Sequence, residues 1–221
     1  MRNVEKNNVP NPCPDQVERY LRAWDELENY HLQENALDKL FFKLCPENTE
    51  MSDILLKVAV LNEFYSTNIF SVYSVAKHIL SLNIDARLDS GDVTLVQDLQ
   101  KVTINGVEKN FYSFSTKYCS HHKPLDYPIY DSYVEKVLCY FRDRDKFSNF
   151  KKCELKNYEK FKEILGIIYT LAPNQDFSME QISEKAPDIT EICKKDMALA
   201  RQSHLYWLQA LMEIHASVSV S

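Results

Sequence analysis

Lys117 has the sequence surroundings of a lysine that could act as a nucleophile. Phe114 lies one helical turn before it, and Phe111 and Tyr118 are close by. A lysine held among aromatic side chains loses hydration, which disfavours its charged form and lowers its pKa. A neutral lysine amine is what Schiff-base chemistry requires. The pattern therefore indicates an amine nucleophile at Lys117.

Asp131 is the second candidate catalytic residue. It follows Pro128-Ile129-Tyr130 and stands where a helix is expected to begin. The proline restricts the chain, so the carboxylate can be aimed from the start of that helix. An acidic group there could stabilise a developing sugar oxocarbenium ion or accept a proton from the lysine.

Both residues also have ordinary structural interpretations. Asp131 or Ser132 would serve as a helix N-cap, and Ser132-x-x-Glu135 fits a capping box. Lys117 could be a solvated helix lysine. Composition and spacing alone therefore do not identify an enzyme.

The elements that would position this pair are expected to be helices. Only 3 glycines occur in 221 residues, fewer than most all-β and phosphate-binding α/β folds use. Apolar spacing predicts helices at 16–27, 37–44, 52–64, 69–80, 95–99, 111–122, from 132, 158–170 and 188–215. Residues 83–92 are expected to form a loop, and 173–187 a linker.

Within these helices the apolar faces can be assigned from the spacing. Leu37, Leu40, Phe41 and Leu44 are expected on one face, and helix 52–64 is apolar on most sides, as a central buried helix would be. Ile69, Val72, Tyr73, Ala76 and Ile79 are expected to lie together. The turn Asn105-Gly106 predicts a short hairpin near 102–108.

These elements predict an all-α fold, a compact helical domain with two lobes around a cleft and one short β-hairpin. Residues 1–14 are expected to be a flexible N-terminus, and 15–221 a single domain. No apolar run approaches the length of a membrane span, and no signal-peptide stretch opens the chain, so we expect a cytoplasmic protein without a membrane partner.

Composition bears on the possible partners. The net charge of −6 disfavours nucleic-acid binding, although basic residues gather in the centre of the chain. The six cysteines show no C-x-x-C pair and are expected to be free thiols. His121 and His122 would point about 100° apart on a helix, so they would not readily share a metal ion. We expect neither a metal nor a cofactor.

The middle third of the chain resembles the helix-hairpin-helix DNA glycosylases, in the 8-oxoguanine glycosylase/AP lyase branch. Tyr127 to Val134 (YPIYDSYV) looks like the family's aspartate motif, Pro-Val-Asp-x-x-Val, with one residue inserted. Phe114-Ser115-Thr116-Lys117 looks like the lysine-bearing helix of the archaeal branch. The resemblance implies that Lys117 is the nucleophile and that Asp131 assists departure of the base.

The resemblance also implies damaged DNA as the partner. Leu55 to Ile79 is similar to the family's early helix pair, whose connecting loop inserts beside a flipped base. On that likeness Asn62 and the loop Phe64 to Asn68, with Tyr65, Ser66 and Thr67, would face the duplex.

Two departures from the family pattern leave alternatives open. The family hairpin usually reads Gly-x-Gly, whereas only Gly106 is present, and the interval from Lys117 to Asp131 is shorter than usual. Lys109 is therefore a rival nucleophile and a further candidate DNA contact. The alternative function is a catalytically inactive helical protein of the same fold that binds a partner or nucleic acid. The lesion and the oligomeric state are not indicated.

Overall fold

The computed structural model describes residues 28–171. The expected helices 16–27 and 188–215 and the linker 173–187 lie outside these residues. The elements, in chain order, are α2 (Glu28–Asp38), the π-helix η1 (Lys39–Leu44), α3 (Met51–Tyr65), α4 (Val72–Leu82), α5 (Asp85–Asp89), α6 (Leu95–Leu99), β1 (Lys101–Ile104), β2 (Val107–Asn110), α7 (Tyr112–His122), α8 (Ser132–Asp145), the 3₁₀-helix η2 (Lys152–Lys156) and α9 (Tyr158–Leu171).

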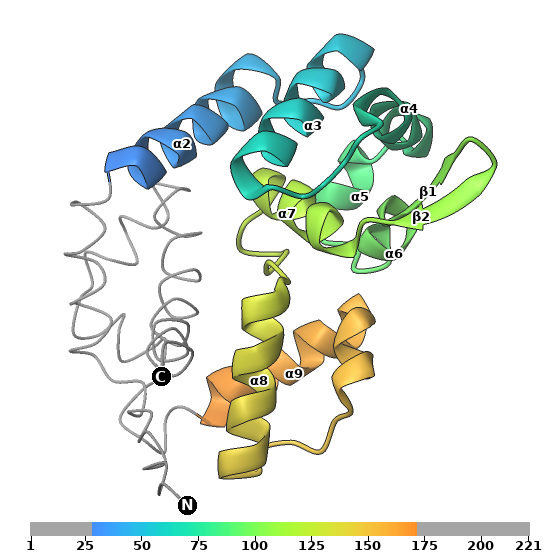
Figure 1. Cartoon of the computed structure of the whole chain (residues 1–221). Helices are drawn as coiled ribbons and strands as arrows, with labels where there is room; N and C mark the ends of the chain where they lie inside the picture. The colour runs from blue at the N-terminus through green and yellow to red at the C-terminus, as the bar shows by residue number, and fades with distance from the viewer. Residues whose placement is uncertain (1–27, 172–221) are drawn as a thin grey trace, which may run out of the picture.

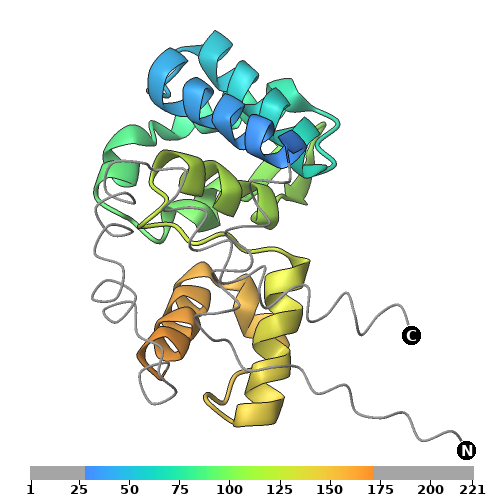
Figure 2. The same ribbon diagram turned by 90° about the vertical axis from the view of Figure 1, so that its left-hand side faces the viewer.

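The described helices form two groups. Helices α2 to α7 and the hairpin make the first lobe, and α8, η2 and α9 make the second lobe (Figure 1). The same division is visible after a quarter turn of the molecule (Figure 2). The predicted all-α architecture with one short hairpin is therefore confirmed.

The hairpin follows the local sequence signal closely. Strands β1 and β2 pair antiparallel, with Ile104 opposite Val107, so Asn105 and Gly106 are the two residues of the turn. Their φ angles are 52° and 77°. Two successive positive φ angles define a type I′ turn, which Asn-Gly sequences favour.

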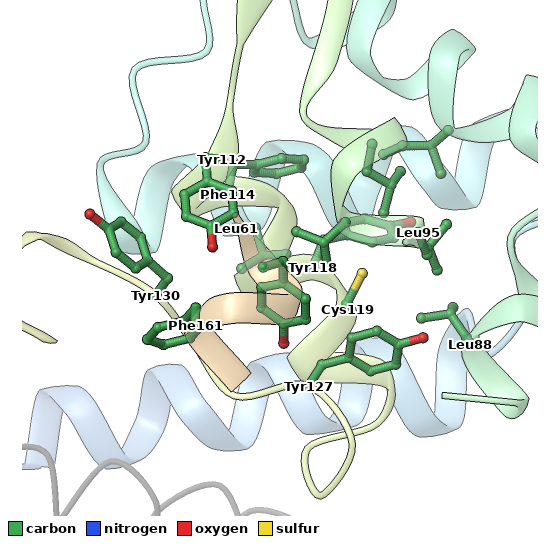
Figure 3. Close-up of a cluster of buried hydrophobic side chains, with 14 of the residues drawn as sticks. Leu61, Leu88, Leu95, Tyr112, Phe114, Tyr118, Cys119, Tyr127, Tyr130 and Phe161 are labelled. Atoms are coloured by element: carbon green, nitrogen blue, oxygen red, sulfur yellow. The ribbon is translucent and has the colours of Figure 1, made fainter. Parts of the chain in front are cut away.

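Helix α7 crosses the middle of the first lobe, and its residues from Phe114 to His122 are all buried. Aromatic side chains from α7, the following segment and α9 pack together there (Figure 3). Tyr112, Tyr118, Tyr127 and Tyr130 belong to this core, whereas Tyr133 is half exposed. The tyrosines of this region thus act largely as packing residues.

Three assignments of apolar faces were wrong. Leu44 is 62% exposed, because the chain changes from α-helix to π-helix at Lys39 and the wider turn rotates Leu44 away from Leu37 and Leu40. Tyr73 is also 62% exposed, while Val75, Ala76 and Ile79 form the buried face of α4.

The third wrong assignment concerns α3, which was expected to be a central helix buried on most sides. It buries the stripe that contains Ile54, Val58 and Leu61, and leaves Leu56 half exposed.

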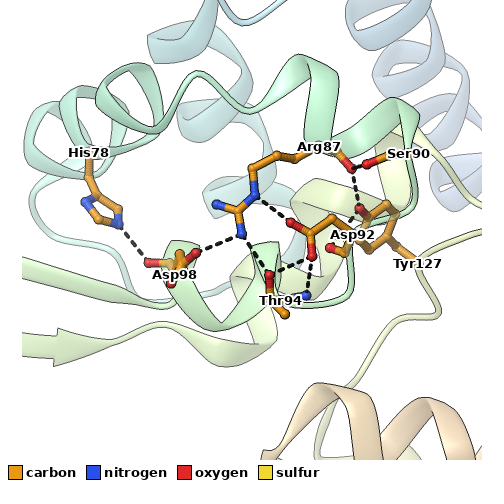
Figure 4. A network of polar contacts seen from close by, with 7 residues as sticks. All are labelled: His78, Arg87, Ser90, Asp92, Thr94, Asp98 and Tyr127. Atoms are coloured by element: carbon orange, nitrogen blue, oxygen red, sulfur yellow. Dashed lines mark hydrogen bonds and ion pairs between the residues drawn. The ribbon is translucent and has the colours of Figure 1, made fainter.

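The segment expected to be a loop at 83–92 contains the short helix α5. Arg87 on α5 holds the following turn through Asp92 at 2.7 Å and Asp98 at 2.8 Å (Figure 4). Tyr127 reaches the same turn, where its hydroxyl donates to the backbone oxygens of Arg87 and Asp92, each at 3.1 Å. These bonds anchor the segment between α7 and α8 to the first lobe.

Two tyrosine hydroxyls bridge the lobes. Tyr112 of α7 donates to the Leu155 carbonyl in η2 at 3.0 Å, and Tyr158 of α9 donates to the Pro128 carbonyl at 2.9 Å. Both bonds are buried, so they fix the second lobe, and with it the start of α8, relative to α7.

The remaining sequence expectations concern thiols and the membrane. The four cysteines within the described residues, Cys45, Cys119, Cys139 and Cys153, are free, and the first two are buried. No helix in residues 28–171 is both long and apolar enough to span a bilayer.

Candidate functional site

Lys117 is buried in the first lobe, with only 5% of its surface exposed. Its Nζ donates to Ser113 Oγ at 2.8 Å and lies 5.3 Å from the centre of the Tyr65 ring. Burial lowers the pKa of Lys117, as the sequence predicted. The sequence did not indicate which aromatic ring contacts the Lys117 amine, however. That ring belongs to Tyr65 of α3, whereas Phe114 packs on Tyr118. The alternative interpretation of Lys117 as a solvated helix lysine is therefore excluded.

Asp131 is the N-cap of α8. Its Oδ1 accepts from the backbone N–H groups of Tyr133 and Val134, both at 2.9 Å, so the capping interpretation is confirmed for Asp131. The carboxylate also raises the pKa of Lys117, opposing the larger effect of burial. Capping of α8 and an electrostatic influence on Lys117 are therefore compatible roles for this carboxylate.

A hydrogen-bonded array supports the Tyr65 ring from behind. The Tyr65 hydroxyl donates to Glu34 Oε1 of α2 at 2.7 Å and lies 3.0 Å from His121 Nε2 of α7. Burial lowers the pKa of His121 to about 4 and keeps the imidazole neutral near pH 7. The Nε2–H tautomer of a neutral imidazole can donate to the phenol oxygen. Glu34, Tyr65 and His121 thus join three helices next to Lys117.

The loop between α3 and α4 is braced from within. Asn62 accepts from Thr67 Oγ1 at 2.9 Å and from the Ile69 N–H at 2.8 Å, and donates to the Ile69 carbonyl at 3.1 Å. Ser66 and Asn68 adopt positive φ angles of 48° and 59°. Asn62 and Tyr65 therefore direct their polar groups into the protein, and a role of this loop in binding DNA stays a prediction.

Phe70 is the residue of this loop that sequence reasoning missed. It is 97% exposed and directly follows Ile69, which is buried. A fully exposed phenylalanine on a braced loop presents its ring to solvent without any local packing that would explain it. The sequence signal was its place beside the expected loop at 64–68.

Lys109, the rival nucleophile, lies on β2 opposite Val102 and is exposed. Its setting lacks the burial and the aromatic face that surround Lys117. The structure therefore places the two candidate lysines in different environments: Lys117 is buried and Lys109 is exposed.

A second lysine, Lys57 of α3, is also buried. Its Nζ donates to Asn48 Oδ1 at 2.6 Å and to the Glu47 carbonyl at 2.8 Å, and lies 3.4 Å from His122 Nε2. Burial lowers its pKa to about 8. His121 and His122 thus point to different partners, and the described residues contain no cluster of three metal-ligating side chains.

A protein-family model covers most of the residues described above. The HI_0787_N family model, described as an N-terminal domain, matches residues 16–126. That range includes Glu34, Tyr65, Lys117 and His121 and stops short of Asp131. An uncharacterized protein of Haemophilus influenzae is similar, with 58% identity over 120 residues, which are 54% of this chain and 60% of that protein. No solved structure matches.

Proposed function

The chain belongs to the HI_0787_N family, and we propose that it is a DNA glycosylase with AP lyase activity, acting in the cytoplasm on an oxidised purine such as 8-oxoguanine. One observation carries the proposal: a lysine buried against the Tyr65 ring has a lowered pKa and is influenced electrostatically by a carboxylate held at the start of the next long helix. A desolvated amine beside a fixed carboxylate suits attack at a sugar C1′.

Each residue has a defined task in this mechanism. The damaged base leaves the stack, and Lys117 in its neutral form attacks C1′. The Nζ–C1′ bond forms as the bond from C1′ to the base breaks, and the base leaves with the bonding electrons. Asp131 stabilises the positive charge that develops on the sugar. The nitrogen loses one proton, O4′ leaves with the electrons of its bond to C1′ and takes up a proton, and the nitrogen lone pair forms the protonated Schiff base. Removal of a C2′ proton then expels the 3′ phosphate.

Two surface features support DNA as the substrate. Phe70 projects from the braced α3–α4 loop, and exposed aromatic side chains can enter a base step and stabilise a distorted duplex. Residues 132–171 contain nine lysines and arginines against six acidic residues, although the whole chain is acidic. Such a local excess of positive charge favours contact with phosphates.

Borohydride trapping tests the proposal directly. The full-length protein is incubated with an end-labelled duplex containing 8-oxoguanine or an abasic site, and borohydride reduces any Schiff base to a stable covalent adduct. We expect an adduct in the wild type and in Lys109→Gln, and none in Lys117→Gln. An adduct lost only in Lys109→Gln would move the nucleophile to the hairpin. Absence of an adduct with both substrates would overturn the proposal.

The second candidate is a non-catalytic nucleic-acid-binding protein of the same fold. The exposed Phe70 favours it, because an aromatic side chain on a rigid loop can stack on a base without any chemistry. Gel retardation of the same duplexes at low salt separates the two functions. Retardation that is weakened by Phe70→Ala, in the absence of any adduct, would support the second candidate.

A further inference from the structure

We infer that Tyr65 is a positioning residue for Lys117, and that Glu34 and His121 support this role by holding the Tyr65 ring. The inference rests on the proposed function for its catalytic consequence. Its geometric content, a fixed ring against the lysine amine, can be tested without any substrate.

The Tyr65 ring is fixed at both ends. Tyr65 is the last residue of α3, and the chain turns at once into the left-handed conformation of Ser66. At the other end of the side chain, the hydroxyl contacts Glu34 and His121, which come from α2 and α7. A tyrosine held by its backbone and by two hydrogen bonds has little freedom to rotate.

The fixed ring forms one wall of the space around the Lys117 amine. Nζ lies over the ring, and Ser113 Oγ accepts one of its hydrogens. A lysine side chain has several rotatable bonds and loses considerable entropy when it is ordered. The ring and Ser113 impose that order before a substrate arrives, so attack at C1′ needs less rearrangement.

The charged and titratable groups around this amine come from four places in the chain. Asp131, at the start of α8, acts on it electrostatically, and Tyr65 contacts it from the end of α3. Glu34 on α2 and His121 on α7 stand behind the Tyr65 ring. Because Asp131 is held by the backbone amides of Tyr133 and Val134 and not by Tyr65, we expect a loss of positioning to be distinguishable from a loss of the carboxylate.

Proton NMR of Lys117 provides the structural test. A nucleus that lies over the face of an aromatic ring resonates upfield of its usual position. We expect upfield-shifted Hε resonances, assigned by their disappearance in Lys117→Gln. They should return towards the ordinary lysine position in Tyr65→Leu and shift partly in Tyr65→Phe, because that ring lacks its two anchors. Tyr73→Leu, at an exposed tyrosine on α4, is the matched control and should change nothing.

Single-turnover trapping provides the catalytic test. We expect the trapping rate to fall at least tenfold in Tyr65→Leu and by a smaller factor in Tyr65→Phe, with duplex affinity unchanged. Unaltered Lys117 resonances in both variants would overturn the inference. If the wild type forms no adduct, the proposed function fails and the NMR result alone decides the positioning role. If Tyr65→Leu does not fold, Tyr65→Phe carries both measurements.

Discussion

At the scale of single residues, Asp131 caps α8 and has a proposed catalytic role, and substitution can separate the two. Asparagine caps helices about as well as aspartate, so Asp131→Asn should retain the bonds to the Tyr133 and Val134 amides. It removes the charge that faces Lys117. We expect the melting temperature to stay within about 2 °C, because the cap is worth only about 1 kcal/mol and is largely kept. The trapping rate should fall at least tenfold.

The control for this substitution is Asp131→Ala, which removes cap and charge together. It should lose about 1 kcal/mol of stability in addition to the catalytic defect. Equal trapping rates in wild type and Asp131→Asn would show that Asp131 serves only as a cap.

His122 should make the protein sensitive to mild acid. Burial holds its pKa well below the usual 6.5, so the folded protein keeps it neutral while the unfolded chain takes up a proton. Stability is therefore complete above pH 6.5 and is lost as the pH falls below it, by up to about 1.4 kcal/mol per pH unit. His122→Leu should reduce this slope in urea unfolding between pH 6.5 and 4.5, and His121, whose pKa burial also lowers, should maintain the remainder.

The candidate site was predictable where its signals are local. Asp131 stands where a proline-bearing segment meets a helix, and Lys117 lies among aromatic residues, so both could be chosen from the sequence. Tyr65 could not be assigned its role, because its partners Glu34 and His121 lie 31 and 56 residues away. Only the packing of α2, α3 and α7 brings these groups together.

At the scale of elements, the same substitution should have opposite effects at two glycines. Gly106 has a φ of 77° in the hairpin turn, and Gly166 lies within α9; an added Cβ meets open space at both. Gly106→Ala should therefore cost about 1 kcal/mol through backbone strain alone. Gly166→Ala should stabilise the protein by roughly 0.5–1 kcal/mol, because alanine favours helix. Thermal unfolding of both variants checks the two signs, and a gain in stability at Gly106 would contradict the assigned turn.

Elements with strong local signals were also the ones predicted best. The hairpin, α7 and the start of α8 carry an Asn-Gly turn, an aromatic helical repeat and an N-cap. The change from α-helix to π-helix at Lys39 has no comparable signal in the sequence, so Leu44 was placed on the wrong face. Tyr73 fits the spacing of the buried stripe of α4, but its ring remains at the surface because the neighbouring elements cover Val75, Ala76 and Ile79 instead.

At the scale of the whole molecule, the candidate site depends on how the two lobes are joined. The lysine lies in the first lobe, within the family-matched range, while Asp131 caps the first helix of the second lobe. The distance between amine and carboxylate is therefore set by the lobe interface. Two buried tyrosine bonds cross it, from Tyr112 to Leu155 and from Tyr158 to Pro128. Loosening that interface should impair the candidate site without altering Lys117 or Asp131 themselves.

The double variant Tyr112→Phe, Tyr158→Phe tests this dependence, because it removes both hydroxyls and keeps both rings. Each lost buried bond should cost about 1 kcal/mol. Amide hydrogen exchange should become faster in α9 than in α3, since the second lobe opens first. The trapping rate should fall while Lys117 keeps its contact with Tyr65. Tyr127→Phe is the matched control, because its hydroxyl bonds only to carbonyls of the first lobe. If exchange rises equally in α3 and α9, the lobes unfold together, and these tyrosines support the whole fold rather than the alignment of lysine and aspartate.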